Sequence, residues 1–383
     1  MTAIASSEPA ASDKAAVSSE SAATPAPPVP SISAPAPAPV VGRLAPSPTG
    51  RMHVGNAYAA LAAWLGARAE GGRVLLRIED IDAPRVVKDA DRWIMDDLAW
   101  LGLDWDGDPV YQSERLDRYE AALRGLREVT LDDGSPLVYP CFCSRADIRA
   151  ASAPNEGDGF LLYPGTCRRL SESVRRERVA RGDRHSWRIA VPGADAPESE
   201  RMVGFVDRVF GEQRFDLARQ LGDVVVRRSD GLFAYQLAVT VDDLAMGVTQ
   251  VVRGRDLLRS TAIQLWIRRW LRVAGVGGDG YDGVRREGAV GGVGDAGVTD
   301  ASVEFAHVPL VDAADGRRMA KRLNSLDLGT LRERGADPRE VLGYCAWLLR
   351  VIDEPRPVGV DELVERFSWG PIAADRADRV VSF

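Results

Sequence analysis

The chain has 383 residues, 45% of them hydrophobic, and a formal net charge of −7. This size allows a sizeable core in two or three domains, and the acidic balance excludes a generally basic protein that coats nucleic acid. No apolar run reaches membrane-spanning length and the N-terminus lacks a secretory signal, so we expect a cytoplasmic protein without membrane contact. Three of the four cysteines lie within residues 141–167, which favours a metal cluster over a disulfide framework.

Two segments have compositions that cannot bury a core. Residues 1–39 are rich in Ala, Pro and Ser, and we expect a disordered tail there. Residues 275–298 are rich in Gly and have no apolar period, which predicts a surface insertion between a helix at 266–274 and the apolar segment 305–311. Arginine-rich runs at 168–184 and 268–272 are compatible with phosphate contacts and equally with solvated helix faces.

Strand and helix patterns alternate between these two segments. Residues 40–44 and 73–78 are predicted to be buried strands. The segment between them has one apolar face at helical spacing, formed by Val54, Ala57, Tyr58, Leu61 and Leu65. Strand, helix and strand make a βαβ unit, which predicts an α/β fold with a parallel, Rossmann-type sheet and a ligand crevice at the carboxyl ends of its strands.

The loop after the first predicted strand has features of a phosphate site. It contains the string Arg43-Leu-Ala-Pro-Ser-Pro-Thr-Gly-Arg-Met-His53-Val-Gly55-Asn56. The helix N-terminus offers free N–H groups to an anion, His53 can donate to a triphosphate, and Gly55 lets adenine or ribose approach the backbone. Taken alone, one His beside one Gly would be better explained as a helix cap.

The whole string, however, resembles the first signature of class I glutamyl-tRNA synthetases, the HIGH element in its glutamyl form. The glutaminyl branch of the class differs after the first Arg, so the resemblance implies glutamate as the amino acid and ATP as the second substrate. Asn56 stands where the motif that gives the element its name ends in His. This departure leaves His53 as the single imidazole available to the phosphates.

A second signature, a KMSKS-like loop, is then implied far downstream, and Arg318-Met-Ala-Lys321-Arg322 occupies that position. Arg318, Ala320 and Arg322 depart from the consensus Lys, Ser and Ser, so closure of this loop is open to question. Lysine is rare in this chain, and Lys321 offers the compact ammonium that suits a moving pyrophosphate contact. A basic surface loop is the plainer alternative.

Glutamate carries two carboxylates and one ammonium, so its site needs cations and an anion. By resemblance to the family, Glu79 holds the ammonium, whereas Arg43, Tyr235 and Arg253 hold the carboxylates; each could instead serve an ordinary structural contact. The implied glutamate-binding residues are Arg43, Leu44, Ala45, Pro46, Ser47, Glu79, Tyr235 and Arg253. The implied ATP-binding residues are His53, Gly55, Asn56 and Lys321, of which His53 and Lys321 act in catalysis and Mg²⁺ accompanies the nucleotide.

Cys141, Cys143 and Cys167 offer three thiolates at a spacing typical of structural zinc. On chemical grounds His185 is the preferred fourth ligand, but some family members that resemble this segment place a Tyr at the position of Tyr163, which we favour. Three reduced surface thiols without metal are the alternative. We predict a zinc-containing subdomain at 141–186, inserted between the catalytic halves 40–140 and 187–311.

Full-length glutamyl-tRNA synthetases continue for hundreds of residues after the second signature, into domains that bind the anticodon. Here residues 312–383 supply only that loop and a short helical region. The chain therefore resembles the glutamyl-queuosine tRNA(Asp) synthetases. The resemblance implies a monomer that activates glutamate without tRNA and transfers it to queuosine in the anticodon loop of tRNA(Asp). The alternatives are a truncated glutamyl-tRNA synthetase that charges tRNA(Glu), and a non-catalytic, zinc-stabilised RNA-binding paralogue.

Overall fold

The structure is a computed structural model that describes residues 39–151, 162–276, 300–313 and 327–381. The predicted N-terminal tail up to residue 38, most of the Gly-rich insertion and the loop with Lys321 lie outside the described residues. Residues 39–383 form one compact unit of the chain, and all the elements described below belong to it.

The predicted βαβ unit is present at the start of this unit. Strands β1 (Val41–Leu44), β2 (Arg73–Ile78) and β3 (Val110–Tyr111) form a parallel sheet in the order β1-β2-β3. Helix α1 (Val54–Arg68) connects β1 to β2 and buries the predicted apolar face. The strand and helix predictions for this region are therefore confirmed.

A second sheet continues the same layer. It has the order β7-β6-β10-β9, with β6 at Met202–Asp207, β7 at Gly211–Asp216, β9 at Gln250–Gly254 and β10 at Glu304–Val308. Strand β10 is parallel to both β6 and β9. The Thr249 N–H donates to Val41 O at 2.9 Å, and the Arg43 guanidinium donates to Val252 O at 3.0 Å. Strands β1 and β9 therefore run side by side in the same direction, and the carboxyl ends of β1, β2, β9 and β10 share one edge.

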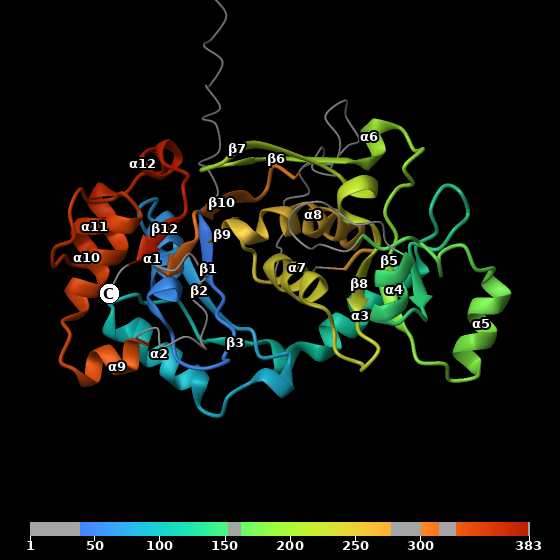
Figure 1. Cartoon of the computed structure of the whole chain (residues 1–383), viewed down its shortest axis with the longest axis horizontal. Coiled ribbons are helices and arrows are strands. Elements are labelled where there is room, and N and C mark those ends of the chain that lie inside the picture. The colour runs from blue at the N-terminus through green and yellow to red at the C-terminus, as the bar shows by residue number, and fades with distance from the viewer. Residues whose placement is uncertain (1–38, 152–161, 277–299, 314–326, 382–383) are drawn as a thin grey trace, which may run out of the picture. The chain divides into compact units, whose positions relative to one another are not determined.

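Helices cover this layer and divide the interior into two main cores. In the first, α1 packs with α10 (Pro338–Leu348) and α11 (Val360–Arg366), which lie beside it in Figure 1. In the second, α3 (Leu116–Glu128), α7 (Tyr235–Ala245) and α8 (Leu258–Val273) pack together. The other α-helices within the described ranges are α2 (Ala90–Trp100), α4 (Arg145–Ala151), α5 (Glu172–Ala180), α6 (Glu198–Arg201), α9 (Leu328–Glu333) and α12 (Trp369–Ala374).

A small antiparallel sheet frames the cysteine-containing segment. Its order is β4-β5-β8, with β4 at Val138–Cys141, β5 at Ser186–Ile189 and β8 at Val224–Arg227. Helices α4 and α5 lie near it (Figure 1). A third, small core belongs to this region and contains Tyr139, Tyr163 and Ala190 together with two of the cysteines.

The C-terminal region contains a strand besides the predicted helices. Strand β12 (Arg379–Val381) pairs in parallel with β11 (Val311–Ala313), which ends just before the segment that contains Lys321. Arg379 is only 3% exposed, and its side chain donates to the carbonyl oxygens of Leu348, Ala377 and Asp375 at 2.7–2.9 Å. Helical periodicity gave no signal for this short strand.

The flanks of the Gly-rich insertion lie close together. The predicted helix at 266–274 is the end of α8, which begins earlier, at Leu258. Asp300, at the far side of the insertion, accepts from Arg268 Nε at 2.8 Å and forms an ion pair with Arg272 at 2.9 Å. Arg268 and Arg272 therefore hold the returning chain through Asp300, and phosphate contact by the run 268–272 stays a prediction.

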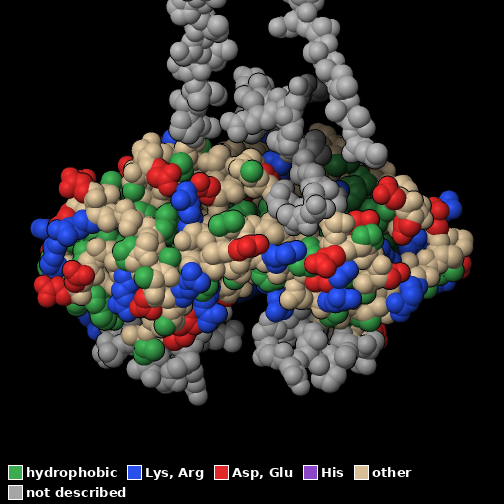
Figure 2. Space-filling model, turned by 90° about the horizontal axis from the view of Figure 1, so that it is seen from above, with side chains coloured by type: hydrophobic (Ala, Val, Ile, Leu, Met, Phe, Trp, Pro, Cys, Tyr) green, Lys and Arg blue, Asp and Glu red, His purple; other side chains and the backbone are tan. Residues whose placement is uncertain are grey.

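The surface offers two further observations. No helix among the described residues is long and apolar enough to cross a membrane. On the face shown in Figure 2, the acidic and basic side chains are mixed. Charge alone therefore does not mark a nucleic-acid surface on that face.

Candidate active site

The first-signature loop is fixed to the carboxyl edge of the sheet by backbone hydrogen bonds. The Glu79 N–H donates to Pro46 O at 2.9 Å, and the Val87 N–H donates to Pro48 O at 2.9 Å. Leu44 is buried, Ala45 and Pro46 are half-buried, and Ser47 is exposed. The first-signature loop, which follows β1, is thereby hydrogen-bonded to the residue that follows β2.

His53 and Asn56 form a reciprocal cap at the N-terminus of α1. His53 Nδ1 accepts from the Asn56 N–H at 3.3 Å, and Asn56 Oδ1 accepts from the His53 N–H at 3.1 Å. Because Nδ1 accepts, the neutral ring carries its proton on Nε2. The plain capping role of His53 is therefore present, and it uses the backbone N–H and Nδ1, so Nε2 takes no part in the cap.

A cavity of about 260 Å³ lies beside this cap. Its lining is His53, Gly55, Asn56, Tyr58, Ala59, Gly254, Asp256 and residues 308–311. A side chain at Gly55 would come within 3.0 Å of the His53 ring and 3.9 Å of Val311, so glycine is the residue that keeps this wall open. All three predicted ATP residues that the structure describes meet at this cavity.

The described residues on both sides of the segment that contains Lys321 lie beside the His53 cap and its cavity. Strand β11, which precedes it, starts at Val311 in the cavity wall. After it, Asp327 forms a β-bridge with His53, and the Leu328 N–H donates to Met52 O at 2.8 Å. Lys321 itself lies outside the described residues.

A buried ion network supports Glu79. Arg77 is fully buried and donates to Asp243 Oδ1 at 2.6 Å and to Glu79 Oε1 at 3.0 Å. Burial raises the pKa of Glu79, and Arg77 opposes this rise. Although burial opposes ionisation of Asp243 as well, Arg77 and Arg43 together hold its pKa below the usual range. The Glu79 carboxylate is thus held at the end of β2 by one buried guanidinium.

The other predicted glutamate-binding residues converge on this network. Arg43 is 4% exposed, and its Nε lies 3.6 Å from Asp243 Oδ1. The Tyr235 hydroxyl lies 3.5 Å from Arg253 NH1, and Tyr235 also interacts electrostatically with Glu79 and Arg43. The four residues, which come from β1, β2, α7 and β9, therefore form one polar cluster at the carboxyl edge.

Arg253 is the member of this cluster that is best placed for a substrate anion. It is 7% exposed, and within the described residues its hydrogen-bond partners are all uncharged: His307, Tyr235, Thr261 and Leu257 O. A buried guanidinium without a carboxylate partner is costly unless a ligand supplies the charge. The geometry favours an anionic ligand beside Arg253 and Tyr235.

Three residues of this cluster were missed by the sequence reasoning. Arg77 and Asp243 were not singled out, and His307 was only one position of the apolar segment 305–311. For Arg77 and Asp243 the signal was present, because each is a charged residue inside an otherwise apolar strand or helix, and such residues are rarely buried without a partner.

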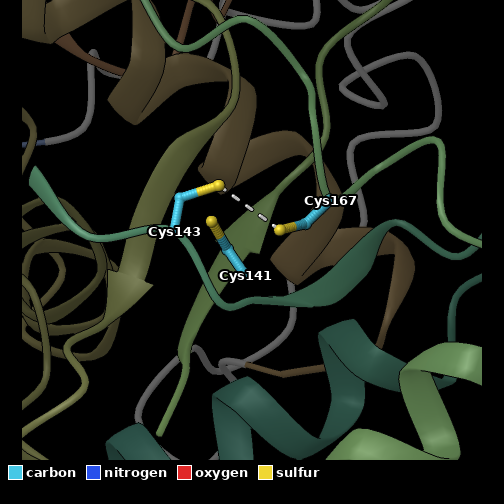
Figure 3. Close-up of side chains that lie close together, drawn as sticks. All are labelled: Cys141, Cys143 and Cys167. Atoms are coloured by element: carbon cyan, nitrogen blue, oxygen red, sulfur yellow. Dashed lines mark hydrogen bonds between the residues drawn. The ribbon is translucent and has the colours of Figure 1, made fainter. Parts of the chain in front are cut away.

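A second cluster lies in the small antiparallel sheet. The Sγ atoms of Cys141, Cys143 and Cys167 lie within 4.8 Å of one another and point toward a common centre (Figure 3). Cys141 and Cys167 are 1% and 3% exposed, so the alternative of surface thiols does not describe them. A hydrogen bond from Cys167 lowers the pKa of Cys141 and raises that of Cys167.

Tyr163, not His185, accompanies these thiols. The Tyr163 hydroxyl lies 3.3 Å from Cys141 Sγ and 3.9 Å from Cys143 Sγ, and it accepts from the Cys167 N–H at 2.8 Å. His185 is outside the cluster; its Nδ1 lies 2.8 Å from Asp183 O and its ring packs against Phe142. Geometry thus favours Tyr163 as the fourth group.

Comparisons with known proteins agree with this arrangement. Residues 39–276 match the family model described as the catalytic domain of class I tRNA synthetases (E and Q). The glutamyl-Q tRNA(Asp) synthetase of Symbiobacterium thermophilum is 41% identical over 344 residues, covering 86% of this chain and 93% of that protein. That of Geobacter sulfurreducens is 45% identical over 295 residues, covering 77% of this chain and 79% of that protein.

A solved structure gives the same picture. The crystal structure of a glutamate tRNA ligase from Elizabethkingia meningosepticum, in complex with its amino acid, superimposes with a TM-score of 0.67. It is 25% identical in sequence, and the match covers 90% of this chain and 67% of that one. The parallel sheet with its mixed α/β surroundings is thus the class I synthetase catalytic fold.

Proposed function

Since this chain belongs to the glutamyl-Q tRNA(Asp) synthetases, a family of class I ligases, we propose that it activates L-glutamate with ATP and transfers it to queuosine in tRNA(Asp). The observation that carries the activation step is the adjacency of two sites at one sheet edge. The cluster around Arg253 and Glu79 suits an amino dicarboxylate, and the cavity at His53 suits a nucleotide.

The first step needs no nucleophilic side chain. The α-carboxylate of glutamate attacks the α-phosphate of ATP in line, giving glutamyl-adenylate and releasing pyrophosphate. His53 Nε2–H and the Lys321 ammonium would stabilise the charge that develops on the pyrophosphate, with Mg²⁺ entering as the counter-ion of the triphosphate. Positioning and charge stabilisation account for this step.

Recognition of glutamate depends on the charges of the cluster. Glu79 would take the ammonium, and Arg43, Tyr235 and Arg253 would take the carboxylates. Glutamine, which lacks the side-chain charge, would leave a buried guanidinium unpaired. The loop residues Leu44, Ala45, Pro46 and Ser47 would supply the wall of the amino-acid site.

The cysteine cluster suits a structural zinc ion. A tetrahedral zinc with Zn–S bonds of about 2.3 Å holds its sulfur ligands about 3.8 Å apart, which agrees with the convergence of the three Sγ atoms. Burial raises the pKa of Tyr163, so its coordination would depend on the cation to displace the proton. The ion would fix the segment 141–186, which we infer to contact RNA.

Two measurements on the purified protein test the proposal. Glutamate-dependent ATP–pyrophosphate exchange without tRNA tests the activation step. Labelled glutamate is then offered with tRNA(Asp) that carries queuosine, with tRNA(Asp) that lacks it, and with tRNA(Glu). Label on queuosine-containing tRNA(Asp) alone is expected, whereas label on the 3′ end of tRNA(Glu) would make the protein a minimal glutamyl-tRNA synthetase.

A further inference from the structure

His307 on β10 is a buried histidine that the activation chemistry leaves without a role. Its residue exposure is 0%, and its Nδ1 lies 2.6 Å from Asp207 Oδ2 on β6. The Asp207 carboxylate also accepts from the backbone N–H of His307 at 3.0 Å. Two hydrogen bonds to one carboxylate therefore fix both the backbone and the ring of this residue.

This arrangement determines the tautomer of the ring. The carboxylate can only accept, so Nδ1 carries the proton and Nε2 keeps its lone pair. Arg253 Nε lies 3.2 Å from His307 Nε2 and, as part of a guanidinium, can only donate. Burial, together with the charges of Arg253 and Arg43, lowers the pKa of His307, in keeping with a neutral ring.

Thr261 on α8 completes the support of the guanidinium. Its Oγ1 accepts from Arg253 NH2 at 2.7 Å and lies 3.2 Å from His307 Nε2. Two of the three guanidinium nitrogens, Nε and NH2, thus donate hydrogen bonds to His307 and Thr261. The third, NH1, faces the Tyr235 hydroxyl in the amino-acid site.

We propose that His307, fixed by Asp207, is a positioning residue that sets the plane of the Arg253 guanidinium and so determines the affinity for glutamate. The inference rests on the proposed function, because it takes Arg253 as a glutamate ligand. His307 itself touches no substrate in this scheme. Its role is to supply an acceptor at Nε2 that a protonated or rotated ring would not supply.

Two substitutions of His307 test the roles of its two ring nitrogens separately. An asparagine amide reaches about as far as Nδ1, so His307→Asn keeps a group for Asp207 but offers no acceptor to Arg253. A glutamine amide reaches about as far as Nε2, so His307→Gln restores that acceptor. Losing one hydrogen bond to a charged group costs about 1.5 kcal/mol, or roughly tenfold in affinity.

The kinetic test uses ATP–pyrophosphate exchange by the full chain. His307→Asn is expected to raise the KM for glutamate about tenfold and to leave the KM for ATP within about twofold, while His307→Gln recovers most of the loss. His185→Asn, the same change at a histidine outside both sites, is the control and should leave both constants unchanged. A KM for glutamate that stays at the wild-type value in His307→Asn, or rises equally for both substrates, overturns the inference.

Two further measurements test the positioning role without relying on the kinetics of His307→Asn. Thr261→Val leaves His307 unchanged but removes the Oγ1 group that accepts from Arg253 NH2 and lies beside His307 Nε2, and it should also raise the KM for glutamate alone. A substrate-free crystal structure of His307→Asn tests the orientation of Arg253 independently of activity: a displaced guanidinium supports the inference, and an unchanged one overturns it. If the wild-type protein shows no glutamate-dependent exchange, the proposed function fails, and the crystal structure of the variant still decides the positioning role.

Discussion

At the scale of single residues, the buried charges decide how the amino-acid site is built. Arg77 is fully buried, yet it faces Asp243 and Glu79 at hydrogen-bond distance. Removing one partner of a buried ion network leaves the others uncompensated, and this costs more than the network contributes as a whole. Arg77 therefore stabilises the fold and holds Glu79 in place through the same side chain.

We expect Arg77→Leu to lower the free energy of unfolding by about 3–5 kcal/mol, because Glu79 and Asp243 both lose the Arg77 guanidinium in the interior. Urea denaturation of the purified variant measures this. Arg92→Leu is the control, since that side chain is 75% exposed and its ion-pair contact to Asp89 is long, at 3.9 Å. Equal stabilities of the two variants would show that the network contributes nothing.

The lowered pKa of His307 predicts a pH dependence of stability. Burial keeps the folded ring neutral, whereas the unfolded chain binds a proton near the ordinary value of 6.5. The contribution of His307 to stability is therefore complete above pH 6.5 and declines as the pH falls below it, since the unfolded state then takes up the extra proton.

The difference between the wild type and His307→Gln isolates this contribution from other titrating groups. The free energy of unfolding is measured for both proteins between pH 7.5 and 5. As the pH falls, the free energy of the wild type should decrease more, so the difference between the two proteins should become smaller. Parallel curves for the two proteins would contradict a depressed pKa at this position.

Sequence reasoning reached part of the site at this scale. Arg43, Glu79, Tyr235 and Arg253 were all predicted, and the structure brings them together, though their roles remain predictions. Asp207 and His307 were beyond reach, because their pairing joins residues 100 positions apart and leaves no local pattern. The site depends on long-range pairs of this kind as much as on its signature loop.

At the scale of elements, periodicity predicted what is long and amphipathic and missed what is short. The predicted strands at 40–44 and 73–78 and the helix between them agree with β1, β2 and α1. Strand β12 has three residues, too few for any period to show. Its place is fixed by Arg379, whose buried side chain donates to Leu348 O of α10 and to Ala377 O just before the strand.

Arg379→Ala should destabilise the protein by about 2–3 kcal/mol through the lost hydrogen bonds to buried carbonyl oxygens. It should also raise the KM for ATP, because β12 holds β11 and Val311 forms part of the nucleotide cavity. Thermal unfolding and ATP–pyrophosphate exchange measure the two effects. Arg376→Ala, at an exposed arginine of the same segment, is the control. An unchanged KM for ATP in Arg379→Ala would show that β12 does not support the nucleotide site.

At the scale of the whole unit, the described residues form three cores of unequal size. The two large cores are built from the helices and sheets of the catalytic fold, whereas the third consists of a few residues around the cysteines. A core this small buries little apolar surface, so we expect it to rely on a metal ion.

Removal of metal with a strong chelator should therefore loosen only this third core. Hydrogen exchange is expected to increase in peptides from residues 138–191 and to stay unchanged in α1 and α8, with the KM for glutamate within about twofold. Cys143→Ser should lose bound zinc, whereas Cys345→Ser, at a buried cysteine outside the cluster, should retain it. Equal metal contents in the two variants would refute a zinc site here.

The parallel pairing of β12 with β11 has a consequence for the order in which the protein matures on the ribosome. The βαβ unit at residues 41–78 can fold early, since its contacts are local in the sequence. The nucleotide cavity depends instead on residues 379–381, which pair with β11. A nascent chain that already contains His53, Gly55 and Asn56 therefore still lacks the strand that supports the Val311 wall of the cavity. Chains that end before residue 379 would thus lack the partner strand of β11, and their affinity for ATP should be lower than that of the full chain.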